Sequence, residues 1–435
     1  MIIPIQYGKK TIRLDIPDKN LAFDMRANRF PVPESETEEI RRCLARPVGT
    51  GRMGALVPKG ASVVILGDDR TRMTPQHKIV PVVLNELNAA GVKDAQVRLI
   101  IAVGTHRPMT AAEIRLKYGD EVLRRVEVIN HDCNDRRNLV DKGVTRRGTR
   151  ILVSKDFMLS DFRIGIGGVL PHHPVGWSGG AKILLPGVAG QETVCAMHLL
   201  GATEQQLGKV VTPCREEMED FAREAGLDFI VNVVMNERGR IVKAVSGHFI
   251  AAHREAVKWG MKVFGVKFRK HADITLSSTY PADYDLTQSD KGLFSAELAT
   301  RKGGEIILVS PCPEGIAPTH GEEMAKLGGY DDETLWAMLK QNRIHDRFCA
   351  SECMYLNHIK RNFKATLMMD PVLSNVMGFH YLSASDLPDY VAYRLRLNNR
   401  LKIGIIHQSG EILPIPPASG IGSVRRNEIA PREPF

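Results

Sequence analysis

The residues best suited to chemistry lie between Pro171 and Leu200, in the stretch PHHPVGWSGGAKILLPGVAGQETVCAMHLL. This stretch contains three histidines, His172, His173 and His198, and it places Lys182 in a Gly-Gly-Ala-Lys turn. Imidazole moves protons near neutral pH and is a good ligand for nickel, copper or zinc. A lysine on a glycine-rich loop can contact a phosphate or form a covalent bond to a cofactor. We therefore expect the functional site to include this stretch.

The Lys182 turn also offers backbone groups, because Ser178-Gly179-Gly180 could present amides to a phosphate. The GxxxxGK[ST] spacing of a Walker A loop is absent, so Lys182 could be a plain phosphate contact. Two adjacent histidines rarely point into one site, which leaves a structural role for one of His172 and His173. His198 could equally be a core residue of a helix that begins near Gln191.

Two other segments carry polar side chains directly after predicted strands. In GDDRTRMTP, the residues Asp69, Thr71 and Arg72 could cap the next helix, or they could hold an anion at its N-terminus. In GTHRP, His106 follows a strand and is placed to be exposed, although a loop histidine can also be purely structural. Farther along, Gln288 and Lys291 share a face if a helix has begun there, a pattern that is also typical of a solvated first turn.

Strand-like and helical segments alternate along the chain, which predicts an α/β fold with largely parallel sheets. We predict strands at 62–67, 97–103, 125–130 and 162–169, and helices at 76–90 and 250–264. Functional loops of such sheets gather at the carboxyl ends of the strands. Asp68-Asp69, His106 and Pro171-His172 each follow a predicted strand, so we expect them to meet at one edge of a sheet.

The length of 435 residues predicts two or three domains. We predict an N-terminal α/β domain over 1–270, which carries Lys182 and the histidines, and a smaller α/β domain over 271–435. The smaller domain is expected to close over a site in the interdomain cleft. The opening sequence MIIPIQYGKKTIRLDIPD predicts a hairpin.

Composition excludes several classes of protein. No apolar run approaches the roughly 20 residues of a membrane helix, and the N-terminus lacks the layout of a signal peptide. The seven cysteines are scattered, and the pair Cys349/Cys353 has no second pair at zinc-site spacing. These features favour a cytoplasmic protein without a disulfide framework. The net charge of +9 comes from basic residues interleaved with acidic ones, which favours small anionic substrates over nucleic acid.

Taken together, these motifs resemble the lactate racemase family, whose enzymes carry a nickel-pincer nucleotide. The resemblance runs from DDRTRMTP through GTHRP and PHHPVGWSGGAKILLPG to QSDKG. The spacing makes it specific, since His106 to His172 is 66 residues, His172 to Lys182 is 10 and Lys182 to His198 is 16.

The resemblance implies a role for each matching residue. Lys182 would form a thioamide bond to the cofactor, a pyridinium-3-thioamide-5-thiocarboxylic acid mononucleotide with nickel, and His198 would be the protein ligand to that nickel. His106 and His172 would be the acid/base pair on opposite sides of the substrate. Arg72, Gln288 and Lys291 would hold the substrate, and Asp69, Thr71, Ser178, Gly179 and Gly180 would hold the cofactor.

The implied reaction inverts C2 of a 2-hydroxy acid by proton-coupled hydride transfer through a 2-oxo acid. The cofactor would be supplied by biosynthesis enzymes that include a nickel-insertion protein. Met73 stands where the family often has proline, and Thr287 stands where an aromatic residue is expected. Because of these departures, lactate, malate, a longer aliphatic acid, an aromatic acid and a sugar acid all stay open as substrates.

Two other classes of protein are weighed against this interpretation. A zinc metallohydrolase could use His106, His172 and His198 as ligands with Asp68 or Asp69 nearby, but it would leave Lys182 without a role. A non-catalytic nucleotide- or anion-binding protein could have kept the same scaffold.

Overall fold

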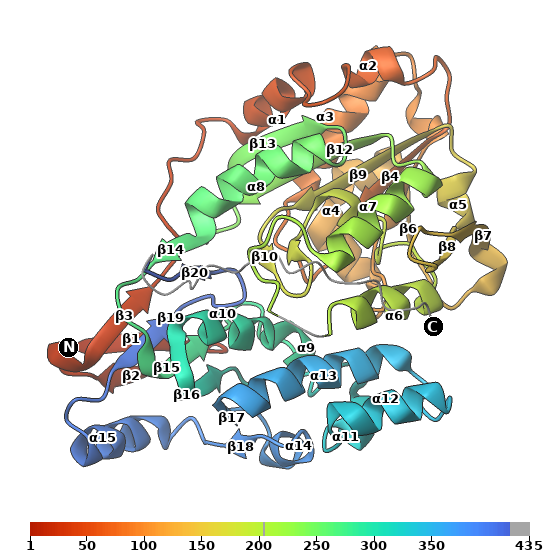
Figure 1. Ribbon diagram of the computed structural model, residues 1–435. Helices are drawn as coiled ribbons and strands as arrows, with labels where there is room; N and C mark the ends of the chain where they lie inside the picture. Colours follow the sequence, from red (N-terminus) through yellow and green to blue (C-terminus); the bar gives the residue numbers. More distant parts are fainter. Residues whose placement is uncertain (203–204, 418–435) are drawn as a thin grey trace. The chain divides into compact units, whose positions relative to one another are not determined.

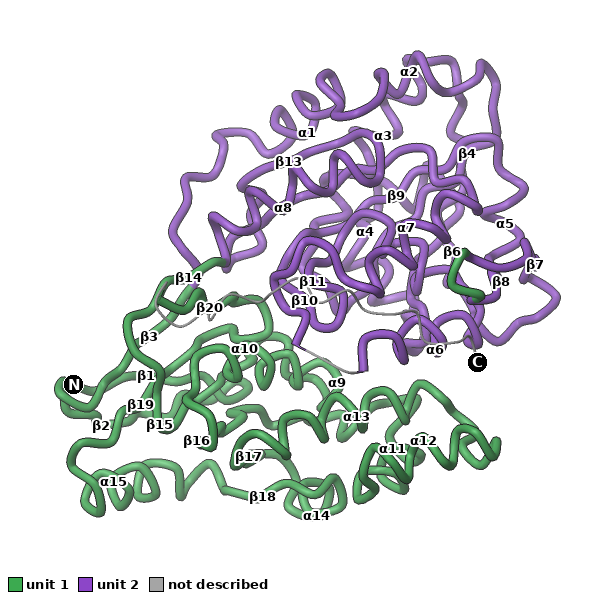
Figure 2. The backbone as a smooth tube through the Cα atoms, in the orientation of Figure 1, with its two compact units in different colours: residues 1–26, 146–148, 265–435 green, residues 27–145, 149–264 purple. Residues whose placement is uncertain are grey.

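The computed structural model describes residues 1–202 and 205–417, which form two compact units of mixed α/β structure (Figure 1). The central unit contains Ala27–Thr145 and Thr149–Phe264. The terminal unit contains Met1–Arg26, Arg146–Gly148 and residues 265–417 (Figure 2). The chain leaves the central unit close to the boundary that we predicted near residue 270. The first 26 residues, which we placed in the N-terminal domain, belong instead to the terminal unit.

The central unit is built on a six-stranded sheet in which only the β12–β13 pair is antiparallel. Its order is β13 (Ile241–Gly247), β12 (Phe229–Met235), β9 (Phe162–Gly168), β4 (Val63–Gly67), β5 (Val97–Ile101) and β6 (Glu127–Asn130). Every residue of β4, VVILG, is buried, as expected for a parallel strand covered on both faces. The predicted strands at 62–67, 97–103, 125–130 and 162–169 are therefore confirmed.

Helices cover this sheet and leave the carboxyl ends of β4, β5 and β9 to loops. The main helices are α1 (Glu36–Ala45), α3 (Gln76–Ala89), α4 (Ala111–Arg125), α6 (Gln191–Leu200), α7 (Pro213–Ala225) and α8 (Ala251–Phe264). Shorter elements of the unit are α2 (Met53–Leu56), α5 (Lys155–Met158) and the hairpin β7 (Leu139–Val144) with β8 (Arg150–Ser154). One apolar core joins the sheet to α1, α2, α3 and α4, and it includes Ile65, Leu84, Leu99 and Val231.

The terminal unit has its own six-stranded sheet, and all of its pairs are parallel. The order is β18 (His380–Tyr381), β17 (Lys364–Leu367), β16 (Thr300–Val309), β15 (Ala272–Ser278), β19 (Ile403–Ile406) and β3 (Leu21–Met25). The pairing of β3 with β19 explains why the first residues belong to this unit. The predicted opening hairpin is confirmed as β1 (Ile2–Tyr7) paired with β2 (Lys10–Asp15).

The helices of the terminal unit follow its strands along the chain. They are α9 (Leu286–Ser289), α10 (Lys291–Ala299), α11 (Gly321–Leu327), α12 (Asp332–Lys340), α13 (Arg347–Asn362), α14 (Pro371–Val376) and α15 (Leu387–Leu397). A short parallel pair joins β14 (Gly265–Lys267) to β20 (Leu413–Ile415). Within the part of the chain that the structure describes, no helix has the length and apolar character needed to cross a membrane.

Candidate functional site

The loops after β4 and β5 meet through a hydrogen bond between Asp69 and His106. The distance from His106 Nδ1 to Asp69 Oδ2 is 2.6 Å. Asp69 is 4% exposed, whereas a third of the His106 side chain is exposed. The ionised carboxylate accepts a hydrogen bond from Nδ1–H of His106. The second ring nitrogen, Nε2, therefore faces away from Asp69. The predicted meeting of these loops at one sheet edge is confirmed for this pair.

Asp69 is held in its ionised form by its surroundings. Burial alone would raise its pKa, but His106, Arg72 and Thr71 together hold the pKa of Asp69 far below its usual range. Its second oxygen, Oδ1, accepts from the Thr71 amide at 2.9 Å and from the Thr71 hydroxyl at 2.5 Å. A buried carboxylate fixed in this way orients the imidazole beside it, as in hydrolase triads.

The neighbouring Asp68 has a structural role instead. Its carboxylate accepts from Thr74 Oγ1 at 2.5 Å and from Gln76 Nε2 at 2.9 Å, and it pairs with Lys117 at 3.0 Å. Its backbone carbonyl accepts from the Tyr118 hydroxyl at 2.8 Å. Asp68 therefore fixes the start of α3.

The arginines of these loops also differ in their partners. Arg107 forms a two-pronged ion pair with Glu113, and Arg70 reaches the same carboxylate at 3.5 Å. The bond from Arg107 is the main reason why the pKa of Glu113 falls to about 2. Arg72 instead donates to Thr71 Oγ1 at 2.9 Å, so its guanidinium belongs to the Asp69–His106 group.

After β9, the chain forms a small hairpin that carries His172 and His173. Strand β10 (Pro171–His172) pairs with β11 (Gly176–Trp177), and His172 lies opposite Gly176. Gly176 has a φ of +77°, and a Cβ there would lie 1.9 Å from the Lys209 carbonyl, so only glycine fits. Both histidines are buried, and His173 Nδ1 lies 3.3 Å from Gln205 Oε1.

Lys182 lies on the short 3-10 helix Gly180–Ile183 that follows this hairpin. Its neighbours Ala181 and Ile183 are buried, whereas Lys182 is half-buried. Ile183 packs onto β9 where Gly165 leaves room, because a Cβ on Gly165 would lie 2.5 Å from Ile183 Cγ2. The His106 loop also reaches this segment, since the Gly104 amide donates to the Gly187 carbonyl at 3.0 Å.

Three buried polar side chains hold the residues just before Lys182. Arg215 on α7 donates to the carbonyls of Trp177 and Gly179, the latter at 3.0 Å. Asn232 on β12 accepts from the Gly180 amide at 2.9 Å, and His253 on α8 donates to the Ser178 carbonyl at 2.9 Å. We call Arg215, Asn232 and His253 the loop clamp. Each is separated from the loop by a long stretch of sequence, so motif spacing gave no signal for them.

The clamp fixes the backbone of Ser178-Gly179-Gly180. The Ser178 hydroxyl donates to the Gly168 carbonyl at 2.8 Å and accepts from the Leu170 amide at 3.0 Å, which closes the loop after β9. The pKa of His253 is far below its usual value because the ring is buried beside Arg215 and Arg254, so the ring is neutral. Its Nδ1 accepts from Arg254 at 2.8 Å, which leaves Nε2–H to donate to the loop.

Replacing Arg215 with lysine is expected to lower the free energy of unfolding by about 2–4 kcal/mol. An ammonium group cannot reach both carbonyls, and it would remain buried with fewer hydrogen bonds. Urea unfolding of the wild type and Arg215→Lys measures the loss. The control is Arg223→Lys on the same helix, because the Arg223 side chain is half exposed, whereas Arg215 is completely buried. Equal losses of unfolding free energy in the two variants would contradict the stabilising role of Arg215 in the loop clamp.

The remaining predicted residues lie on three helices, one in the central unit and two in the terminal unit. His198 is half-buried in the last turn of α6, in the central unit. Gln288 and Lys291 lie in the terminal unit, on α9 and at the first residue of α10, and Lys291 Nζ donates to Gln288 Oε1 at 2.5 Å. Their predicted shared face is confirmed. Asp285 caps α9 by accepting from the Gln288 amide at 2.9 Å.

The metallohydrolase alternative gains no support from the geometry. Across residues 1–202 and 205–417, the one group of three side chains spaced to ligate a metal ion is His320, Asp346 and Cys349. This group contains none of His106, His172 and His198. All seven cysteines are free thiols and buried. Burial raises the pKa of Cys353 to about 12, so the Cys349/Cys353 pair belongs to the core of α13.

Comparison with known proteins places the chain in a family. Residues 7–208 match the family model of the lactate racemase N-terminal domain. The lactate racemases of Thermoanaerobacterium thermosaccharolyticum and Lactiplantibacillus plantarum are each 31% identical to the chain over 329 residues, which cover 74% of this chain and 76% of theirs.

Solved structures agree with this result. The lactate racemase apoprotein from Thermoanaerobacterium thermosaccharolyticum superposes with a TM-score of 0.84 at 27% identity, covering 95% of this chain and all of that one. A protein from Thermotoga maritima shares the fold, with a TM-score of 0.72 at 19% identity over 90% of this chain and 100% of that one. The chain therefore belongs to the lactate racemase family, and it is an isomerase.

Proposed function

We propose that the protein inverts C2 of a small 2-hydroxy acid with a nickel-pincer nucleotide bound covalently to Lys182. Family membership supports the reaction class. The observation that carries the proposal is the Asp69–His106 pair, a partly exposed imidazole held by a buried carboxylate, in the same unit as the Lys182 segment. Such a pair can take up and return a proton during turnover.

The residues present fit the proposed cofactor. Lys182 provides a half-buried amine on a segment whose backbone is fixed by the loop clamp. His198 provides a half-buried imidazole, a donor suited to nickel. We propose Lys182 as the covalent attachment and His198 as the nickel ligand. Asp69, Thr71 and Ser178-Gly179-Gly180 would shape the loops that hold the nucleotide.

The chemistry that this group supplies when bound is reversible uptake of the hydride from C2. The protein's own residues supply the proton transfers. His106 and His172 would each hold or release the proton of the C2 hydroxyl, one for each configuration at C2. Arg72, Gln288 and Lys291 would hold the substrate, with the two cations directed to its carboxylate. The adjacent His173 has its own polar neighbour in Gln205, which fits a structural role.

The proposal has consequences for how the protein must be prepared. We propose that it works in the cytoplasm with enzymes that build the cofactor, including a nickel-insertion protein. Protein co-expressed with those enzymes and nickel should convert a single enantiomer of lactate, L-malate or D-gluconate to a mixture of the two configurations at C2. Chiral chromatography measures this conversion. Protein expressed alone is the blank. If protein that carries the adduct converts none of these acids or their homologues, the proposal is wrong.

Replacing Asp69 with asparagine is expected to lower kcat by at least about 100-fold while the cofactor adduct remains. The amide can donate to Nδ1 as well as accept from it, so the ring would no longer be held with its proton on that atom. Turnover and intact mass of Asp69→Asn measure the two effects. Asp68→Asn is a comparison for stability, since Asp68 holds α3 rather than His106. Unchanged turnover in Asp69→Asn would remove the pair from the mechanism.

Asp69 should also make stability depend on pH in a defined direction. The pKa of Asp69 is lower in the folded protein than in the unfolded chain, where it is about 3.9. Its stabilising contribution is therefore complete above roughly pH 5 and is lost as the pH falls below about 4. The difference in unfolding free energy between the wild type and Asp69→Asn should shrink from pH 7 to pH 3 in urea titrations. A constant difference would contradict this assignment.

A further inference from the structure

A second group of buried polar side chains lies in the terminal unit, around Lys291. We call it the His320 cluster, and it consists of Asp285, Asp290, Lys291, His320 and Glu352. The charge of Glu352 raises the pKa of the Asp290 carboxyl, whereas the charge of Lys291 lowers the pKa of both carboxyls. Sequence spacing could not reveal the cluster because its members lie at the start of α9, at the α9–α10 junction, on α10, on α13 and directly before α11.

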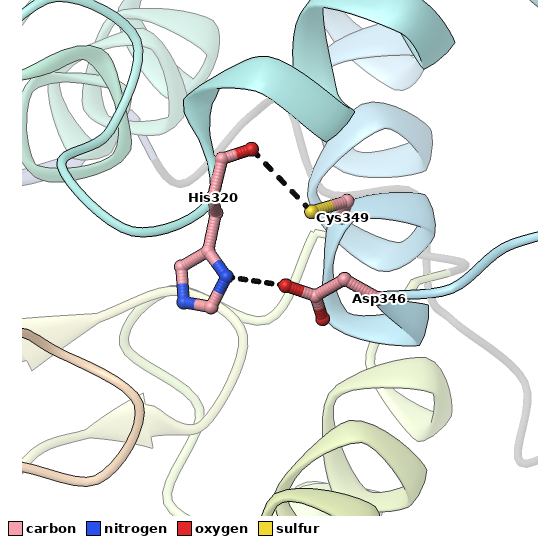
Figure 3. Close-up of side chains that lie close together, drawn as sticks. All are labelled: His320, Asp346 and Cys349. Atoms are coloured by element: carbon pink, nitrogen blue, oxygen red, sulfur yellow. Dashed lines mark hydrogen bonds and ion pairs between the residues drawn. The ribbon is translucent and has the colours of Figure 1, made fainter.

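His320 is fixed by its neighbours in one orientation. Its Nδ1 lies 2.5 Å from Asp346 Oδ2 (Figure 3). Its ring also lies against Phe348, with the two ring centroids 4.5 Å apart. Asp346 is itself fixed as the cap of α13, where it accepts from the Phe348 amide. His320 is 8% exposed, and among the described residues its Nε2 has no hydrogen-bond partner. A buried donor or acceptor in that state costs stability unless a ligand satisfies it.

The acidic members of the cluster can both donate and accept hydrogen bonds. Glu352 is 6% exposed, and burial raises its pKa to about 7, although His320 and Lys291 act in the opposite direction. Burial beside Glu352 also raises the pKa of Asp290 well above its usual range. A protonated carboxyl donates one hydrogen bond and accepts others, as a hydroxyl group does.

The charges of the cluster select among the possible ligands. Burial already favours the neutral forms of Asp290 and Glu352, so a second carboxylate on the substrate would bring a further negative charge into a position that disfavours charge. An alkyl or aromatic side chain would leave His320 Nε2 buried without a partner. A metal ion at His320, Asp346 and Cys349 is also disfavoured, because Asp346 already serves two donors and burial raises the pKa of the Cys349 thiol.

We propose that His320, positioned by Asp346, and Glu352 form a subsite for hydroxyl groups on the side chain of a polyhydroxylated 2-hydroxy acid. This inference rests on the proposed function, in which Lys291 holds the carboxylate of the same substrate. His320 Nε2 and the Glu352 carboxyl bind hydroxyls beyond C2. The substrate class is then a sugar acid rather than lactate, malate or an alkyl or aromatic analogue.

The test compares substrates and variants on enzyme that carries the adduct. D-gluconate, 2-hydroxyhexanoate of the same chain length, and L-malate are assayed for inversion at C2 with the wild type, His320→Asn, His320→Phe, Glu352→Gln and Glu352→Leu. The wild type should have the highest kcat/KM for D-gluconate. His320→Phe and Glu352→Leu should lose about 10- to 100-fold of that value. They should change kcat/KM for 2-hydroxyhexanoate by less than about threefold, and Glu352→Gln should lose less than Glu352→Leu.

The controls distinguish a failure of the proposed subsite from a failure of the proposed function. His380→Asn replaces an exposed histidine of the same unit and should leave all three substrates unaffected. Intact mass and thermal unfolding check each variant, and the asparagine and glutamine variants serve where the apolar ones do not fold. A wild type that prefers malate or 2-hydroxyhexanoate would overturn the subsite and keep the proposed function. Equal losses of kcat/KM on all three substrates in the His320 and Glu352 variants would also overturn the subsite. Inversion of no 2-hydroxy acid at all would overturn the proposed function itself.

Discussion

Replacing Lys182 with alanine is expected to remove the covalent adduct and all turnover. The alanine side chain has no nitrogen to form the thioamide bond, and no other lysine lies on the segment that the loop clamp fixes. Lys182 is half-buried between two buried neighbours, so the substitution should leave the core intact. Intact mass after co-expression with nickel and the cofactor-building enzymes measures attachment, and chiral chromatography measures turnover.

Lys182→Arg is the matched control for charge. It keeps a cation on the turn but cannot form the same bond, so it should be as inactive as Lys182→Ala. If Lys182 were only a phosphate contact, Lys182→Arg would retain a share of cofactor binding and activity. An adduct of unchanged mass in Lys182→Ala would contradict the attachment site.

Replacing either His106 or His172 with alanine should lower turnover by about 10²- to 10⁴-fold and leave the adduct and nickel in place. Each histidine is proposed to serve one configuration of the hydroxyl group, so inversion needs both. The His106 and His172 variants should lose turnover but keep the cofactor and its nickel. A His198 variant should instead contain less nickel. Nickel content, intact mass and kcat are measured on the same preparations.

His77→Ala is the control for the histidine variants, because His77 is exposed on α3 in the same unit. It should retain wild-type turnover. Full activity in His106→Ala or His172→Ala would remove that residue from proton transfer. Full activity in His172→Ala together with inactivity in a correctly folded His173→Ala would reassign the role to the neighbouring histidine.

The parts of the fold and the site that are local in sequence could be predicted. Strand β4 reads as a buried apolar run, and the polar residues after β4 and β5 follow directly from strand ends in a parallel sheet. The Asp69–His106 contact follows from that rule, because β4 and β5 are neighbours. The pairing of Gln288 with Lys291 follows from helical spacing.

Features that depend on tertiary contacts could not be predicted. Strand β3 resembles any short apolar segment, and only its pairing with β19 assigns it to the terminal unit. Arg215 looks like a surface residue of an amphipathic helix, yet it is completely buried against loop carbonyls. His320 and Glu352 stand apart in sequence without a motif, and packing of the terminal unit alone brings them together.

The measurement that tests the central claim most directly is the intact mass of the wild-type protein, co-expressed with nickel and the cofactor-building enzymes and compared with protein expressed alone. Peptide mapping then locates any added mass. We predict a nickel-dependent adduct on Lys182 and none in protein expressed alone. Absence of an adduct, under conditions in which a lactate racemase of the same family acquires one, would contradict the account.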